Sequence, residues 1–101
     1  MSEVKLGSKY FDLNIDSVLQ TARVGMRIDL CINSPGIGYS FIKGVVDAVI
    51  RNTNRRVVNI YIKREEPLPQ VTVQLHNRGV GKWVYAAGHI INEEVLNITL
   101  V

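Results

Sequence analysis

The sequence predicts a mainly β protein, a small and strongly bent barrel of about five to six strands with a short helix near the N-terminus. Apolar and polar residues alternate along several short stretches, and this two-residue period is typical of a strand with one buried face. Turn-forming residues separate these stretches at short intervals, as they do in small barrels. A chain of 101 residues is large enough for one hydrophobic core, so we expect a single domain over residues 1–101.

The stretch from Phe41 to Arg64 is the centre of the predicted fold. Its first half is rich in β-branched residues and contains Gly44, a combination that weakens a helix and suits a bent strand. The polar run from Asn52 to Arg55 interrupts the apolar pattern, and alternation resumes at Val58. We therefore predict a β-hairpin with a basic tip. A helix over the first half, within a βαβ unit, is the alternative, because apolar residues there also recur every four positions.

The stretches before the hairpin predict one helix and one strand. Asn14 or Asp16 can cap a helix of about two to three turns that ends at Gly25. Apolar residues between positions 10 and 13 are expected to form either a plug or a short strand over one end of the barrel. Strict alternation from Met26 to Ile32 predicts a half-buried strand, which a turn at residues 34–38 joins to the hairpin.

The remainder of the chain predicts further short strands. Two prolines after residue 66 interrupt strand pairing, because neither can donate a backbone hydrogen bond. Alternation resumes at Val71, a second hairpin turn covers residues 77–81, and a short return strand covers residues 83–86. Gly88 permits a tight corner, and a last alternating strand with Leu96, Ile98 and Leu100 reaches the C-terminus. If the barrel does not close within one chain, this last strand is expected to pair with a neighbouring subunit.

Composition restricts the location and the class of function. The chain lacks both an apolar run long enough to span a membrane and an N-terminal secretory signal, so we expect a cytoplasmic protein without a membrane partner. The net charge of +3 is modest, but six of the 12 basic residues lie between Lys43 and Arg64. This local excess indicates either phosphate binding or a hairpin that carries charge to stay solvated.

Catalytic and metal-binding patterns have little support. Cys31 is the single cysteine and is expected to be a small buried or half-buried residue in a strand. His76 and His89 are isolated and lack the spacing of metal ligands, and an enzyme would need a pocket that brings one of them beside an acid. The glycine-containing turns lack the full spacing of a phosphate-binding loop. We expect no catalysis, no cofactor and no metal site.

The hairpin tip favours a binding function. Asn52 and Asn54 offer amides that can contact the edges of bases, and Arg55 and Arg56 offer guanidinium groups for phosphate contacts or stacking. Four aromatic residues either supply stacking faces or pack in the core: Tyr39, Tyr61, Trp83 and Tyr85.

Gly44, followed ten residues later by Asn54, resembles a pattern of the Sm-like (LSm and Hfq) family, in which a glycine of the second strand precedes an asparagine in the next turn. The run from Val84 to Ile90 is similar to that family's later motif, with Gly88 at the corner before the last strand. The resemblance covers roughly Asp16 to the end of the chain.

The resemblance implies an Sm-like β-barrel that forms a homo-oligomeric ring through strand pairing between subunits and binds single-stranded RNA. It nominates Asn54 and Gly88 as RNA-binding residues, with His89 as a further pocket residue in place of the family's basic side chain. With the hairpin tip, the candidate RNA-binding residues are Asn52, Asn54, Arg55, Arg56, Gly88 and His89. The alternative is a structural or protein-interaction module whose strand edges pair with a partner.

Overall fold

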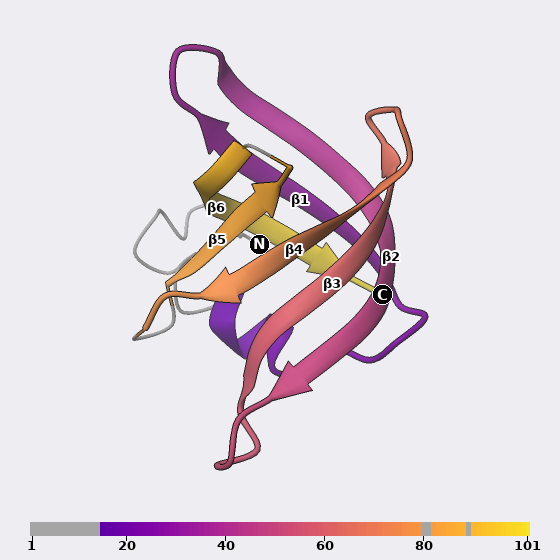
Figure 1. Ribbon diagram of the computed structural model, residues 1–101, viewed down its shortest axis with the longest axis vertical. Coiled ribbons are helices and arrows are strands. Elements are labelled where there is room, and N and C mark those ends of the chain that lie inside the picture. Colours follow the sequence, from indigo (N-terminus) through magenta and orange to yellow (C-terminus); the bar gives the residue numbers. More distant parts are fainter. Residues whose placement is uncertain (1–14, 80–81, 89) are drawn as a thin grey trace, which may run out of the picture.

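The computed structural model describes residues 15–79, 82–88 and 90–101. In this part of the chain, six antiparallel strands form a closed barrel in sequence order, with a short helix on the N-terminal side (Figure 1). The strands are β1 (Arg27–Ser34), β2 (Gly38–Arg51), β3 (Val57–Glu66), β4 (Val71–Asn77), β5 (Trp83–Ala87) and β6 (Ile90–Leu100). The predicted fold class is therefore confirmed. The described residues include no helix with the length and apolar character needed to cross a membrane.

The central hairpin is formed by β2 and β3. The residues of β2, many of them β-branched, form one strand of 14 residues, so the hairpin prediction is confirmed and the βαβ alternative is wrong. The strand pairs with β1 through Gly38–Val45 and with β3 through Lys43–Arg51. Because β2 bends between these two neighbours, its first part pairs mainly with β1 and its second part mainly with β3.

Gly44 lies where β2 changes partner. A Cβ atom at this position would collide with the Lys63 carbonyl oxygen and would lie 2.7 Å from Ile62 Cγ2. The pairing register with β3 also shifts between Lys43 and Gly44. A glycine is required here because the backbones of β2 and β3 approach each other too closely for a side chain.

The N-terminal helix covers residues 15–19 and is shorter than predicted. The backbone N–H groups of Thr21 and Ala22 donate to carbonyl groups three residues earlier, at 3.0 and 3.1 Å, and this tight turn ends the helix. Gly25 is not its cap, because the Gly25 N–H donates to the Val46 carbonyl at 2.9 Å on the approach to β1. The predicted helix end at Gly25 is therefore wrong. Asn14 and the apolar residues at positions 10–13 lie outside the described residues.

The last strand also differs from its prediction, because β6 starts earlier and contains a bulge. Cys31 and Ile32 of β1 face Asn97 and Val95, which leaves Leu96 as an extra residue without a partner in β1. Val95 is consequently buried in the core. The predicted alternation of Leu96, Ile98 and Leu100 is confirmed, because each is partly buried and Asn97 and Thr99 between them are exposed. Before the bulge the side chains that point inward have the opposite parity, because the extra residue shifts the alternation by one position.

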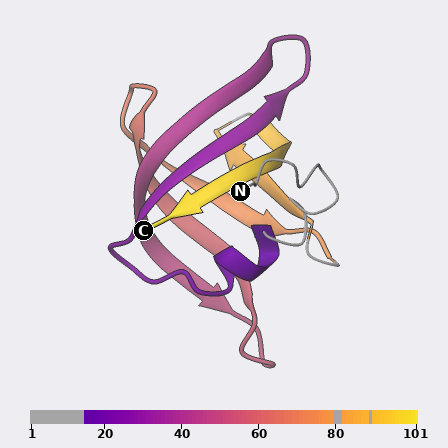
Figure 2. The same cartoon turned by 180° about the vertical axis from the view of Figure 1, so that it is seen from behind.

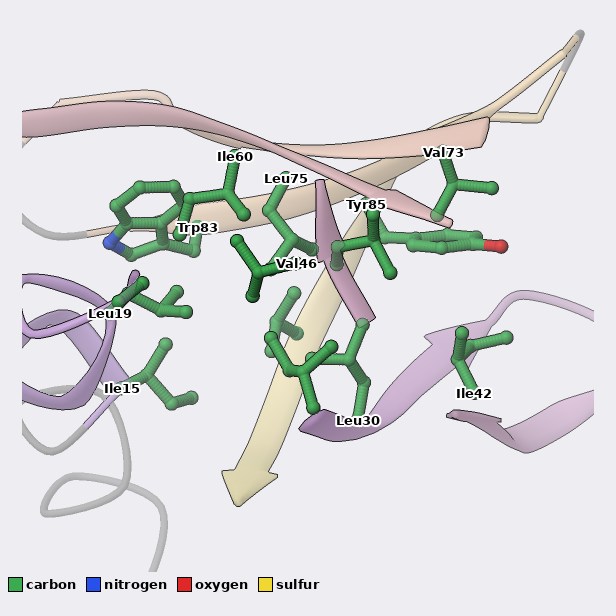
Figure 3. Packing of buried hydrophobic residues seen from close by; sticks show 14 of the residues in the cluster. Ile15, Leu19, Leu30, Ile42, Val46, Ile60, Val73, Leu75, Trp83 and Tyr85 are labelled. Carbon is green, nitrogen blue, oxygen red and sulfur yellow. The ribbon is translucent and has the colours of Figure 1, made fainter. Parts of the chain in front are cut away.

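The inward-facing side chains of the strands and the helix form one hydrophobic core (Figure 3). Trp83 lies beside Leu19 and Ile15 of the helix, whereas the ring of Tyr85 extends towards the part of the core that contains Ile42 and Val73. The helix therefore covers one end of the barrel. Trp83 and Tyr85 are core residues, so of the four aromatic residues considered for stacking only Tyr39 and Tyr61 are accessible to a ligand.

Antiparallel strands place successive turns at alternate ends of a barrel. The turns after β2 and β4 lie at the end that the helix covers, which we call the helix end. The turns after β1, β3 and β5 lie at the opposite end (Figures 1 and 2). This alternation decides which of the predicted site residues can act together.

Candidate nucleic-acid interface

The turn between β2 and β3 is held by the side chain of Asn52. The Asn52 Oδ1 atom accepts hydrogen bonds from the backbone N–H groups of Asn54, at 2.9 Å, and Arg56, at 3.1 Å. The Asn52 backbone N–H also donates to the Arg56 carbonyl at 2.9 Å. The side-chain oxygen of Asn52 is thus used to shape the turn, as in other asparagine-initiated turns. The side chain of Asn54 is exposed.

Arg56 is tied to the N-terminal helix. Its Nη2 atom donates to Asp16 Oδ2 at 2.7 Å, and the other oxygen of the same carboxylate accepts from Trp83 Nε1 at 3.0 Å. The helix is further attached by Gln20, whose side-chain amide donates to and accepts from the backbone of Val57 at 2.9 and 2.8 Å. Arg56 therefore connects the hairpin to the helix, and its charge is largely balanced by Asp16.

Arg55, unlike Arg56, is not attached to the helix. Its backbone φ is 65°, a left-handed conformation that costs a residue other than glycine about 1 kcal/mol or more. Arg51 stabilises this conformation, because its Nη1 atom donates to the Arg55 carbonyl at 3.0 Å. The Arg55 guanidinium itself is exposed and forms no hydrogen bond or ion pair with another described residue. The turn therefore holds a strained backbone, and the cation at its tip has no partner among the described residues.

The turn between β4 and β5 adds further positive charge at the helix end. The Arg78 backbone N–H donates to the Lys82 carbonyl at 2.7 Å, and Asn77 Oδ1 accepts from the Gly79 N–H at 2.8 Å. The side chain of Arg78 is exposed and has no acidic partner among the residues that the structure describes. Lys82 is 4.0 Å from Glu94, a weak and solvated pair. We call the two turns that carry Arg51, Arg55, Arg78 and Lys82 the basic turns.

Side chains that can form hydrogen bonds cover the outer surface of β3 and β4. In the pairing register, Asn59 lies opposite His76, Tyr61 opposite Gln74, and Lys63 opposite Thr72. These residues point outward because they alternate with buried residues such as Ile60 and Leu75. We call this surface the polar face: Asn59, Tyr61, Lys63, Thr72, Gln74 and His76. Its first row lies next to the basic turns, since Asn59 closely follows one turn and His76 closely precedes the other.

One atom of the polar face lacks a partner. Asn59 Nδ2 donates to Gln74 Oε1 at 3.3 Å, but Asn59 Oδ1 is buried and has no hydrogen-bond partner in the described structure. Buried polar atoms are nearly always hydrogen-bonded, so this unpaired acceptor is an exception within the polar face.

The structure does not bring all the predicted site residues together. Asn54 and Arg55 lie at the helix end, whereas Gly88, with φ of 60°, forms the corner after β5 at the opposite end. The reason is the number of strands, since the corner after a fifth strand lies at the same end as the turns after the first and third. His89 lies outside the described residues.

Polar side chains also line the barrel interior at this opposite end. Ser34 Oγ donates to Glu93 Oε1 at 3.2 Å, and Arg64 Nη1 donates to the Tyr85 hydroxyl at 3.0 Å. Sequence reasoning missed this cluster because its members lie far apart in the chain. Tyr85 and Glu93 are brought together only by the pairing of β5 with β6.

Cys31 is half-buried on the outer surface of β1, opposite Phe41 of β2, and burial raises the pKa of its thiol. Among the described residues, no cluster of histidine, cysteine and acidic side chains could hold a metal ion.

The fold and the site together define a small closed β-barrel with a basic end and a polar outer face. None of the three comparisons made with this chain, against family models, curated proteins and solved structures, gave a match.

Proposed function

We propose that this chain is a non-catalytic β-barrel that binds single-stranded RNA. In this proposal, the basic turns hold the phosphates and the polar face contacts the bases. The observation that carries the proposal is the pair of exposed arginines, Arg55 and Arg78, which occupy two turns at one end of the barrel and have no acidic partner among the described residues.

Phosphate binding accounts for the conformation of Arg55. A left-handed backbone at an arginine is unfavourable, and such strain is commonly found where a side chain must be held for a ligand. Guanidinium groups suit phosphate because they donate two parallel hydrogen bonds. Arg51 contributes positive charge and also fixes the turn, because it binds the Arg55 carbonyl.

Single-stranded nucleic acid fits the polar face better than a duplex does. Tyr61 offers a ring for base stacking, and the amides of Asn59 and Gln74 can pair with the edges of unstacked bases. In this proposal the Asn59 side chain rotates on binding, so that its buried and unpaired Oδ1 accepts from a base amino group or a ribose 2′-hydroxyl. We place the RNA on this face, and not near Gly88, because the basic turns adjoin the polar face and Gly88 lies at the other end.

The resemblance to Sm-like proteins is part of this proposal. It rests on Gly44 and Asn54, which lie in the second strand and in the turn before the third strand. Ring assembly stays a prediction. In the closed barrel, β6 pairs with β1 over its C-terminal half and with β5 over its N-terminal half, so pairing with another subunit would need a different edge or an opened barrel.

The test is fluorescence anisotropy with labelled uridine-rich and adenosine-rich oligonucleotides at several salt concentrations. Each phosphate contact contributes about 0.7 to the slope of log K against log salt for single strands, so Arg55→Ala with Arg78→Ala should lower this slope by about 1 to 1.5. Tyr61→Ala should weaken binding by about 1 to 3 kcal/mol, and Tyr61→Phe should retain most of the affinity.

Two control substitutions remove an arginine and a tyrosine that lie outside the proposed RNA-binding surface. Arg27→Ala deletes a cation that pairs with Glu65 at 2.9 Å, away from the basic turns, and Tyr39→Ala deletes an exposed ring at the opposite end. Both should leave the affinity nearly unchanged. Equal losses from Arg27→Ala and Arg55→Ala would show that binding follows net charge alone, and absence of binding at low salt would reject the proposal. DNA oligonucleotides of the same sequence test the preference for RNA.

A further inference from the structure

The first part of β2 is paired on one side only. Residues 38–42 pair with β1, but pairing with β3 begins at Lys43, which faces Glu66, the last residue of β3. Pro67 then leads the chain away into the turn before β4. Among the described residues, therefore, the other side of residues 38–42 is a free strand edge at the end of the barrel opposite the helix.

The direction of the backbone groups follows from the pairing pattern. The Val46 N–H donates to Met26 at 2.8 Å and the Val46 carbonyl accepts from Gly25 at 2.9 Å, so both groups of Val46 face the β1 side. Backbone groups of successive residues point to alternate sides of a strand. The N–H and C=O groups of Tyr39 and Phe41 therefore point out of the free edge.

The side chains on the outer surface of this edge, and that of Ile37 just before it, are apolar and exposed. The exposed fractions are 80% for Ile37, 71% for Tyr39 and 69% for Phe41. No charged residue occurs from Ser34 to Ile42. Natural sheets usually protect exposed edges with charged residues, and exposed apolar groups at an open edge are typical of surfaces that bind another chain.

The C-terminal half of β6 is also paired only with β1, but it lacks these features. The Ile98 N–H is already bonded to the Asn97 side chain at 2.8 Å, and Ile98 and Leu100 pack against the core. An edge whose donor is satisfied within its own strand is less available for pairing.

We propose that the free edge of β2 is a homodimer interface in which two copies pair antiparallel about a two-fold axis through Ser40. This register places Tyr39 opposite Phe41 of the partner subunit, and the reverse. Each of the two Tyr39–Phe41 pairs forms two backbone hydrogen bonds, four in all, and brings two aromatic rings together across the strands. The same surface of each subunit meets its copy, as a two-fold axis requires.

Neighbouring registers fail for a specific reason. An axis through Phe41 would need the outward groups of Lys43, which pair with Glu66. An axis through Tyr39 would need Ile37, whose N–H already donates to the Ser34 carbonyl at 2.9 Å. The turn at residues 35–37 bends towards β1, on the side away from the partner, so five residues are enough for the pairing.

Sedimentation velocity over a concentration series tests the proposal. The wild-type protein should have the mass of a dimer, and Tyr39→Lys with Phe41→Lys should have the mass of a monomer with an unchanged circular dichroism spectrum. Leu68→Lys introduces one lysine at an exposed apolar residue of the adjacent turn, outside the pairing, and should stay dimeric. A wild-type monomer at every concentration, or a larger assembly that persists in the double variant, overturns the proposal.

A disulfide tests the register. The two Ser40 residues would form a pair without backbone hydrogen bonds, with Cα atoms about 4.5 Å apart, which is within the range that a disulfide spans. In a Cys31→Ser background, Ser40→Cys should give a covalent dimer on mild oxidation, whereas Tyr39→Cys should not, because its symmetry mate would be too distant. The reverse result overturns the register. The edge lies at the opposite end from the basic turns, so dimerisation and RNA binding can fail independently.

Discussion

Gly44→Ala tests the central structural requirement of the barrel, the close approach of β2 to β3. The added methyl group would overlap the Lys63 carbonyl oxygen and lie 2.7 Å from Ile62 Cγ2. Both neighbours are constrained, because Lys63 contributes backbone and Ile62 is fully buried. The strands must therefore separate at the point where β2 changes partner.

The expected cost combines two opposing terms. Inserting a methyl group into a closely packed site costs about 1 to 3 kcal/mol, and a backbone atom as the obstacle favours the upper half of that range. Replacing glycine by alanine also restricts the unfolded chain, which stabilises the protein by about 0.4 to 1 kcal/mol. We expect a net loss of about 1 to 2 kcal/mol in the free energy of unfolding, or roughly 5 to 15 °C in the melting temperature of a domain this size.

Urea unfolding followed by the fluorescence of Trp83, the single and buried tryptophan, measures this change. Gly36→Ala is the control, because Gly36 has φ of 84° and open space around it, so it reports backbone strain without a collision. Gly44→Val should cost more than Gly44→Ala. If Gly44→Ala raises stability, as it would in open space, the close approach of the two strands is wrong.

Three further predictions follow from the helix end and from Cys31. Asp16→Ala removes the acceptor of both Trp83 and Arg56, so it should lower the free energy of unfolding by about 2 kcal/mol. It should also change the fluorescence emission of Trp83 in the native protein, and an unchanged spectrum would contradict the hydrogen bond between Trp83 and Asp16. Gln20→Ala leaves the buried backbone groups of Val57 unpaired and should cost about 2 to 3 kcal/mol in urea unfolding, and a loss below about 1 kcal/mol would argue against the two hydrogen bonds to Val57. Because burial raises the pKa of Cys31, its thiol stays protonated at neutral pH, so it should react with a disulfide reagent more slowly than glutathione and faster as the pH rises; a rate equal to that of glutathione at pH 7 would refute this.

The strands were predictable because each one has a recognisable pattern of residues in its own segment of the sequence. The alternation from Met26 to Ile32 and from Val71 onward corresponds to β1 and β4, and the β-branched run with Gly44 corresponds to the bent β2. The helix was predicted too long because its end depends on the Gly25 contact with Val46, which lies 21 residues further along the chain. The bulge at Leu96 escaped prediction because it is set by pairing with β1.

The candidate site was predictable only in part. The tip from Asn52 to Arg56 was identified by its residue types. The sequence does not show that Arg56 is paired with Asp16 while Arg55 has no partner in the part of the chain that the structure describes. The outward direction of Asn59 and His76 follows from alternation within each strand, yet their place beside each other follows only from the register of β3 against β4.

Alone, the sequence determined the fold class, the central hairpin and the concentration of positive charge near its tip. These features depend on interactions between residues close in the chain, so periodicity and turn chemistry are sufficient to predict them. Tertiary structure decided which turns share an end of the barrel and, among residues 15–79, 82–88 and 90–101, which arginines lack an acidic partner and which strand edge is unpaired. Those properties depend on contacts between distant segments, and one strand more or fewer moves a turn such as Gly88 to the other end of the molecule.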